Sequence, residues 1–140
     1  MEKITIQIET EVNPTESEEK VKKALWNLFG DTPTETKPAQ KGTLLIAQAH
    51  DREPLATLRN MLHRDHIRDA ARKALYNGLR EGTLTFYVNK QAAFANHVSF
   101  SEPEAESPLG PIKVTIQTQD PLQLIDWLAP KTEKTQRVNK

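Results

Sequence analysis

The sequence predicts an α+β domain in which helices pack on one face of a mostly antiparallel sheet of about five strands. The predicted elements follow the order β, α, β, α, α, β, β, β, α, which is neither the alternation of a doubly wound parallel sheet nor an all-β array. Most strands alternate apolar and polar residues, and each helix carries one apolar stripe. The last three strands follow one another in sequence, so we expect them to pair as a meander.

The first part of the chain contains two strands and one helix. Residues 3–12 alternate apolar and polar side chains, which predicts a strand with one buried face. Thr15, with a glutamate three residues later, has the spacing of a capping box and starts a helix that ends at Gly30. Residues 31–41 contain two prolines and three threonines without periodicity, so we expect an exposed loop. The run 44–49 is apolar on both parities and predicts an inner strand.

Two helices are predicted in the middle of the chain. The first covers residues 51–61 and has Pro54 in its first turn, where the missing N–H costs little. The polar stretch 63–66 interrupts the helical pattern. A further helix then runs to about Arg80 and ends at Gly82, because glycine is favoured just beyond a helix terminus.

Two more strands follow these helices. Residues 83–88 alternate threonine or tyrosine with apolar side chains, which predicts a strand with one buried face. Asn89 is suited to cap a short helical turn that ends at Phe94. Val98 and Phe100 mark the next strand.

The C-terminal part is predicted to hold the last strand and the last helix. Residues 101–110 are acidic and poor in apolar side chains, which predicts a solvated connector. The strand at 112–116 alternates again, and Asp120, followed by proline, is an N-terminal signal for a helix. Residues 131–140 are expected to form a flexible basic tail. A single domain therefore extends over residues 1–130.

Charge and composition limit the classes of function. Lys plus Arg and Asp plus Glu number 19 each, so the formal net charge is zero and any anion site must be a local patch. The absence of cysteine excludes disulfides, thiolate metal sites and a cysteine nucleophile, and it fits a reducing compartment. No apolar run approaches a membrane span, and no signal-type segment opens the sequence. We expect a cytoplasmic protein.

The most prominent candidate site is a row of arginines. Helical steps of 100° place Arg64, Arg68 and Arg72 one turn apart along the margin of an apolar face. Arg80 and Lys90 are close in sequence to the same junction. Guanidinium groups at this spacing could contact successive phosphates of a nucleic acid.

The same residues have a second interpretation. Asp65 stands three residues before Arg68, and Asp69 stands four residues before Lys73. These are the spacings of ion pairs that neutralise a solvated helix surface. The spacing alone leaves both interpretations open.

Aromatic residues offer one candidate for base stacking. Tyr87 lies on the polar parity of its strand, close in sequence to Lys90. Its ring could equally pack under a helix. Phe86 is expected in the core, and Trp26 and Trp127 at the core margin or in contact with a partner.

No motif for catalysis or for a cofactor is present. His63 and His66 are one turn apart near acidic residues, but no diagnostic zinc spacing accompanies them. His97 and Ser99 lack a nucleophile elbow, and the glycines form neither a Walker loop nor a dinucleotide fingerprint. We therefore expect a protein that is not an enzyme and that holds no metal or cofactor.

Four short motifs carry a resemblance to a known family. They read VNPTE at 12–16, IRDAAR at 67–72, NKQAA at 89–93 and IDWLAP at 125–130. In this order they resemble an uncharacterised archaeal family whose members are described as RNA-binding proteins or predicted exosome subunits. The resemblance extends to about Pro130. It implies an α+β fold similar to that of ribosomal protein L-five.

Two hypotheses for function follow. In the first, the chain is a non-catalytic RNA-binding domain, an accessory to RNA processing or the exosome, with phosphates contacted where helix meets sheet. In the second, it is a protein-interaction or self-assembly module, for example a homodimer, in which the arginine row forms salt bridges between chains. The candidate RNA-binding residues are Arg64, Arg68, Arg72, Arg80, Tyr87, Asn89, Lys90 and Gln91, together with the basic tail.

Overall fold

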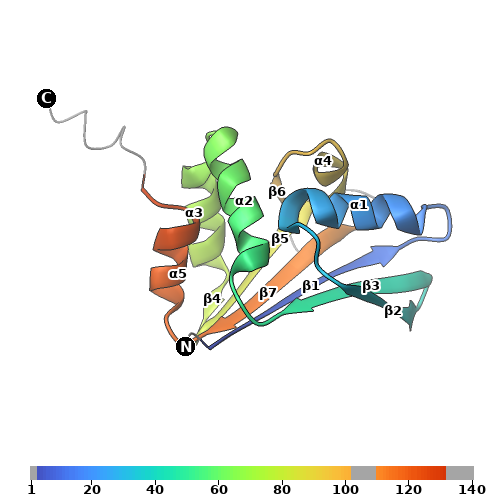
Figure 1. Cartoon of the computed structure of the whole chain (residues 1–140), viewed down its shortest axis with the longest axis horizontal. Coiled ribbons are helices and arrows are strands. Elements are labelled where there is room, and N and C mark those ends of the chain that lie inside the picture. Colours follow the sequence, from blue (N-terminus) through green and yellow to red (C-terminus); the bar gives the residue numbers. More distant parts are fainter. Residues whose placement is uncertain (1–2, 102–109, 132–140) are drawn as a thin grey trace, which may run out of the picture.

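The computed structural model describes residues 3–101 and 110–131, and Figure 1 shows helices covering one face of a twisted sheet. The α+β class and the antiparallel sheet are confirmed. The strands are β1 (Ile4–Val12), β2 (Thr34–Ala39), β3 (Gly42–Ala49), β4 (Leu79–Arg80), β5 (Thr83–Asn89), β6 (Phe100–Ser101) and β7 (Pro111–Thr118). The helices are α1 (Glu18–Phe29), α2 (Glu53–Arg64), α3 (Arg68–Asn77), α4 (Lys90–Phe94) and α5 (Pro121–Leu128).

The sheet contains seven strands among the described residues, two more than the sequence pattern predicts. Its order is β2-β3-β1-β7-β5-β4, and β6 also pairs with β5. β4 and β6 contact opposite ends of the same outer edge of β5, whereas β7 lies between β5 and β1. The predicted meander is therefore wrong. β6 is only two residues long, so the apolar strand β7 takes the long interior position beside β5.

The strand register places the hydrophobic core on one face of the sheet. Ile6 and Ile8 of β1 stand opposite Ile116 and Val114 of β7, and all four side chains are buried. The helices add their apolar stripes, including the one predicted for α1. The residues of the other parity are mainly Thr and Gln and form the uncovered face of the sheet. They include Thr5, Gln7, Thr83, Thr85, Thr115 and Gln117.

Helix capping follows the sequence at two of three predicted positions. Asn89 Oδ1 accepts the N–H of Ala92 at 2.9 Å and starts α4, and Asp120 caps α5 in the same way. The predicted capping box at Thr15 is wrong, because Ser17 is the N-cap of α1 and accepts the N–H of Lys20. The preceding turn is instead held by the Glu16 carboxylate, which accepts two hydrogen bonds from Asn13.

Two predicted boundaries are corrected by the structure. Residues 34–39 form β2 and not a loop; their side chains lack apolar periodicity because this edge strand is half-buried at its ends and exposed between them. The helix expected to reach Arg80 ends at Asn77, with Gly78 as its C-cap, and the next two residues form β4. The interruption predicted at 63–66 is confirmed, since α2 ends at Arg64 and His66 has a positive φ of 58°.

Two sequence predictions fall on residues that the structure leaves undescribed. Residues 102–109 make up most of the predicted solvated connector, and residues 132–140 make up most of the predicted basic tail. Both predictions lie outside the described part of the chain.

Gly78 is required where the end of α3 approaches β5. A Cβ atom at this position would lie 1.8 Å from the carbonyl oxygen of Thr85, a backbone atom that the sheet holds in place. We predict that Gly78→Ala lowers the free energy of unfolding by about 3 kcal/mol, because overpacking against backbone forces strands apart. Denaturant unfolding measures the change. Asn77→Ala is the control and should shift stability by no more than about 0.5 kcal/mol; equal stability of the two variants would contradict the steric argument.

Candidate nucleic-acid interface

Lys90 is an interior residue and not a surface cation. Its side chain is 0% exposed, and its ammonium group donates to the carbonyl oxygen of Glu11 at 2.6 Å and to Glu16 Oε1 at 3.0 Å. The Glu16 side chain is itself only 7% exposed. The prediction that Lys90 contacts RNA phosphates is therefore corrected: burial removes this charge from any ligand.

The buried ion pair joins two of the sequence motifs. Glu16 belongs to the motif at 12–16 and Lys90 to the motif at 89–93, and Asn13 donates two hydrogen bonds to the same Glu16 oxygen. The corner that leads from β1 into α1 is thereby attached to the corner that leads from β5 into α4. These motifs hold the fold together.

Arg72 joins the other two motifs. Its Nη1 donates to Asp126 Oδ1 and to the carbonyl oxygen of Ala129, both at 2.9 Å, and its side chain is only 12% exposed. Its guanidinium also lies over the ring of Tyr76, 5.5 Å from the ring centre. The motif at 67–72 thus anchors α3 to the motif at 125–130 on α5.

The predicted arginine row does not exist as one helical face. Arg64 is the last residue of α2, Arg68 is the first of α3, and the chain reverses between them. Arg64 and Arg72 both have partners within the chain, so the row offers no set of cations for salt bridges between chains. Arg68 is partly exposed and forms no hydrogen bond or ion pair within the described residues.

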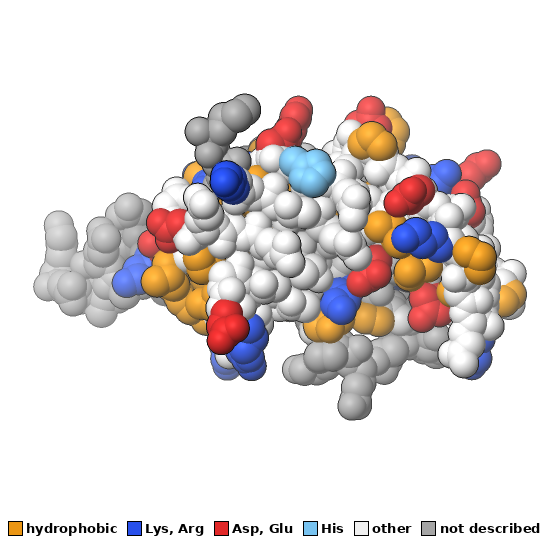
Figure 2. All heavy atoms as spheres, turned by 90° about the horizontal axis from the view of Figure 1, so that it is seen from below, with side chains coloured by type: hydrophobic (Ala, Val, Ile, Leu, Met, Phe, Trp, Pro, Cys, Tyr) orange, Lys and Arg blue, Asp and Glu red, His pale blue; other side chains and the backbone are white. Residues whose placement is uncertain are grey.

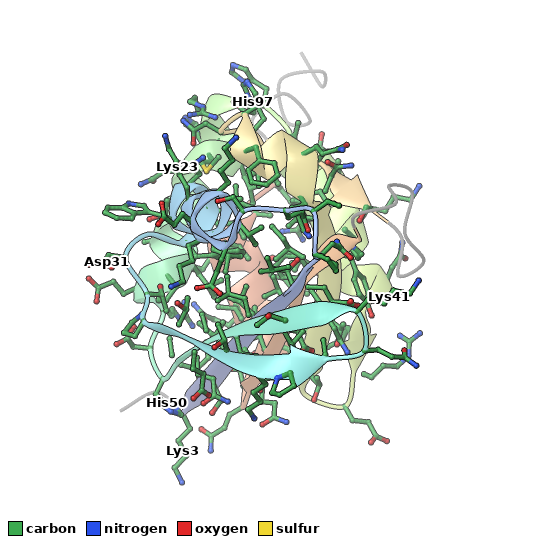
Figure 3. All side chains as sticks on the ribbon, turned by 90° about the vertical axis from the view of Figure 1, so that its right-hand side faces the viewer. Lys3, Lys23, Asp31, Lys41, His50 and His97 are labelled. Carbon is green, nitrogen blue, oxygen red and sulfur yellow. The ribbon has the colours of Figure 1, made fainter. Side chains whose placement is uncertain are left out.

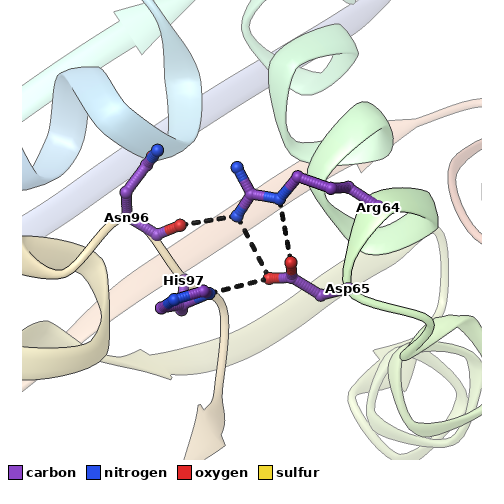
Figure 4. Close-up of polar contacts among 4 residues, drawn as sticks. All are labelled: Arg64, Asp65, Asn96 and His97. Carbon is purple, nitrogen blue, oxygen red and sulfur yellow. Dashed lines mark hydrogen bonds and ion pairs between the residues drawn. The ribbon is translucent and has the colours of Figure 1, made fainter.

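Arg64 takes part in a polar cluster that links two loops (Figure 4). Its guanidinium donates to both carboxylate oxygens of Asp65, at 2.8 and 3.2 Å, and to the carbonyl oxygen of Asn96 at 2.6 Å. His97 Nδ1 lies 3.3 Å from Asp65 Oδ2. The bond with Arg64, and secondarily that with His97, lowers the pKa of Asp65, and the same carboxylate raises the pKa of Arg64. The cluster connects the α2–α3 junction to the loop after α4.

A groove at the outer edge of β5 brings together two predicted site residues. β4 covers the start of β5 and β6 covers its end, which leaves a notch between them. A cavity of about 410 Å³ opens there between the C-terminal end of α3 and the strands. Its lining includes Asn77, Arg80, Tyr87, Phe100 and Ser101. The groove lies where a helix meets the sheet, but Arg80 and Tyr87 line it and not Arg64, Arg68 or Arg72.

Arg80 and Tyr87 have the properties that a nucleic-acid groove needs. Arg80 is exposed, and its Nη1 is held by the carbonyl oxygens of Asn77 and Leu79 at 3.2 and 2.7 Å. Its Nε and Nη2 make no hydrogen bond within the described residues. Tyr87 is half-buried on the uncovered face of the sheet and does not lie under a helix.

The remaining predicted residues have different roles. Asn89 is the N-cap of α4, which uses its side-chain oxygen. Gln91 is exposed on α4. Sequence reasoning did not find Asn96, whose positive φ of 64° and carbonyl contact with Arg64 depend on tertiary structure, nor the groove residues Asn77 and Ser101.

The uncovered face of the sheet carries little charge. Figure 2 views the molecule from this side: uncharged polar side chains and backbone occupy its centre, while side chains of both charges lie to the right of it and along the rim. Among the described residues, one ion pair lies on this face, in which Lys113 Nζ is 3.9 Å from Glu9 Oε1. A phosphate chain has little electrostatic reason to lie across the middle of the sheet, so the edge groove is the better candidate.

Two further classes of site can be assessed for the described residues. Within residues 3–101 and 110–131, no group of three His, Asp or Glu side chains could hold a metal ion. His63 and His66 therefore do not belong to such a group. Among the described helices, none combines the length and apolar character that a transmembrane helix needs.

The fold is that of a small antiparallel α+β domain with a groove at the outer edge of β5. A protein-family model described as RNA binding matches residues 5–118, and the chain belongs to this family. The relatives are UPF0201 proteins of archaea, which confirms the resemblance drawn from the four motifs.

Individual relatives cover nearly the whole chain. The UPF0201 protein of Sulfurisphaera tokodaii is 46% identical over 127 residues, which are 91% of this chain and 88% of the relative. That of Pyrobaculum arsenaticum is 44% identical over 91% of this chain and 90% of its own. The crystal structure of the UPF0201 protein from Methanococcus jannaschii superposes with a TM-score of 0.80 at 30% identity, covering 92% of this chain and 95% of that chain.

The buried pair of Lys90 and Glu16 predicts a pH-dependent stability. Burial raises the pKa of the Glu16 carboxyl, but hydrogen bonds from Asn13 and Lys90 outweigh it and lower this pKa below its ordinary value of 4.5. A lowered folded-state pKa contributes stability above the unfolded-state value, and this contribution is lost as pH falls through the folded-state value. Lys90→Met should cost about 3–5 kcal/mol at neutral pH, because it leaves a buried carboxylate without its cation.

The measurement is denaturant unfolding between neutral pH and pH below 4.5, with Glu16→Gln and the double variant completing a cycle. The cost of Lys90→Met should shrink once Glu16 is protonated. A cost that is independent of pH and of Glu16→Gln would show that only the side-chain packing of Lys90 matters.

Arg72 is predicted to stabilise the fold and not to bind RNA. Arg72→Met should lower the free energy of unfolding by about 1–3 kcal/mol, because hydrogen bonds to charged groups of this kind carry that value. The matched control is Lys73→Met, which removes a positive charge from the next residue, whose side chain is exposed. Thermal unfolding distinguishes them; equal melting temperatures would contradict the role of Arg72 as an anchor between α3 and α5.

Proposed function

We propose that this chain binds RNA without catalysing a reaction, through the edge formed by α3, β5 and β6. The observation that carries the proposal is the match of residues 5–118 to a family described as RNA binding. The groove at this edge supports it, because it combines an arginine, an aromatic ring and neutral hydrogen-bonding groups. The resemblance to predicted exosome subunits extends the proposal to an accessory role in cytoplasmic RNA processing.

The chemistry of the groove fits an unpaired nucleotide. Tyr87 offers a ring face on which a base can stack, and Arg80 offers a phosphate its Nε and Nη2 groups, which have no partner among the described residues. Asn77, which is exposed, can form hydrogen bonds with a base edge or a ribose 2′-hydroxyl. The buried hydroxyl oxygen of Ser101 has no hydrogen-bond partner among the described residues.

The geometry of the edge favours single-stranded RNA. α3 has ten residues, about 15 Å of helix, and separates the groove at its C-terminal end from the cluster of Arg64 and His97 near its start. A single RNA strand that follows α3 would meet the partly exposed Arg68 at the start of the helix, and Arg80 with the Tyr87 ring beyond its end. A double-stranded RNA would present its backbone to these groups and keep its bases paired inside the helix. Proteins recognise RNA sequence mainly through unpaired bases in single strands.

The proposal predicts a defined salt dependence of RNA affinity. Arg80→Ala should weaken binding of a short single-stranded RNA and reduce the slope of log affinity against log salt by about 0.7, the value for one phosphate contact. Tyr87→Ala should weaken binding by about 1–3 kcal/mol and change the slope little, because it removes stacking and not charge. Fluorescence anisotropy with a labelled oligonucleotide over a range of salt concentrations measures both.

Lys41→Ala is the matched control, because Lys41 is an exposed cation at the turn between β2 and β3, away from His97 (Figure 3). It should leave affinity and slope nearly unchanged. Equal effects of Arg80→Ala and Lys41→Ala would contradict the assignment of the groove. Absence of RNA binding by the unmodified protein would contradict the proposed function itself.

A further inference from the structure

The outer edge of β2 is a second surface, at the opposite end of the sheet from the groove. β2 is the terminal strand of the sheet order and pairs only with β3 among the described residues. Figure 3 shows this hairpin below α1, with Asp31 in the loop that enters β2 and Lys41 at the turn. The surface is independent of the proposed RNA site.

The hydrogen-bond pattern of the hairpin shows which backbone groups face outward. Ala39 pairs with Gly42 across a two-residue turn, which makes them a hydrogen-bonded pair. In an antiparallel ladder such pairs recur at every second residue, so Lys37 and Glu35 also bond to β3. The N–H and C=O groups of the intervening threonines, at 34 and 36, therefore point away from the sheet.

The third residue of this outward set is Pro38. Its missing N–H lies on the open side, so proline costs no hydrogen bond to β3. The outward edge thus presents the donors of Thr34 and Thr36 and the acceptors of all three residues. This edge can accept another antiparallel strand.

The side chains of β2 are self-complementary. Glu35 and Lys37 lie on the same face of the strand, one residue on either side of Thr36. If two β2 strands pair antiparallel about a two-fold axis at Thr36, Glu35 of each copy stands opposite Lys37 of the other. Opposite charges directly across an antiparallel pair stabilise it. Thr34 then faces Pro38: the Thr34 N–H donates to the Pro38 carbonyl oxygen, whereas the Thr34 carbonyl receives no bond in return because proline has no N–H.

An exposed tryptophan lies next to this edge. Trp26 of α1 is 62% exposed. Together with Leu25, Phe29 and Thr34 it lines a hollow of about 210 Å³ between α1 and the start of β2. A second copy placed on the β2 edge would cover this hollow and the ring of Trp26, so burial of apolar surface would add to the strand pairing.

We propose that a second copy of this chain occupies the β2 edge, in a two-fold dimer with a continuous sheet. Lysine and proline commonly protect edge strands from pairing. Here the lysine finds a glutamate of the second copy, and each proline costs the dimer only one hydrogen bond, at an end of the paired segment. The pairing strand has only six residues, so the dimer forms reversibly with concentration.

Sedimentation equilibrium over a wide range of protein concentration tests the proposal. Thr36→Pro removes one outward N–H from each copy at the axis and should raise the dissociation constant about tenfold or more. Trp26→Ala should also weaken the dimer. Because both residues are partly or fully exposed, circular dichroism melting curves should show that the monomer fold is retained.

A charge exchange provides the sharper test. Glu35→Lys and Lys37→Glu should each weaken the dimer, because like charges then meet across the axis, and the double variant should restore it. A monomer at every concentration, or a dimer that is unchanged by Thr36→Pro and by both single charge reversals, would overturn the proposal. Arg80→Ala should leave the dimer intact, so failure here is distinguishable from failure of the RNA proposal.

Discussion

A buried ammonium group holds this domain together. Removing a lysine charge from water costs several kcal/mol, and the geometry around Lys90 offsets this with a carboxylate and a backbone carbonyl. β1 and β5 do not pair with each other, since β7 lies between them, so the contact of Lys90 with Glu11 and Glu16 ties together strand ends that the ladder does not join. It also sets the position of α4 beside α1, where Asn27 donates to the carbonyl oxygen of Ala93 at 2.9 Å. The position of α4 determines the loop to His97 and β6, and hence one wall of the groove.

The other half of the helical layer is fastened by arginines. Arg72 ties α3 to α5, and Arg59 ties α2 to α5 by donating to the carbonyl oxygen of Trp127 at 2.7 Å while lying over its ring. Guanidinium groups suit this role, because they combine several donors with stacking on aromatic faces. Several cations of a protein without net charge are therefore committed to its own structure. A ligand must be recognised by local shape and a small number of exposed groups.

The two edges of the sheet differ in what they offer. At the β5 edge, two short strands leave a notch with side chains suited to a nucleotide. At the β2 edge, the backbone itself is open and the side chains match those of a second copy. A dimer through β2 would place two copies of the proposed RNA groove at the far ends of one continuous sheet. Two linked sites on one RNA would raise the overall avidity without any new contact, provided the strand spans the distance. This arrangement would suit a protein whose individual groove is small.

Local sequence patterns were sufficient to predict the α+β class, the inward residues of β1, β5 and β7, and the caps at Asn89 and Asp120, because alternation and capping depend on neighbouring residues. They did not predict β2, since an exposed edge strand has no apolar face to reveal it. They also suggested a row of arginines along one helix. The chain reverses at His66, so these arginines belong to two different helices. The role of Lys90 depended on Glu16, 74 residues earlier, so only the folded chain could show that this charge is internal. In the same way Arg80 and Tyr87 could be proposed from sequence, but the groove that unites them exists only because Gly78 lets α3 meet β5.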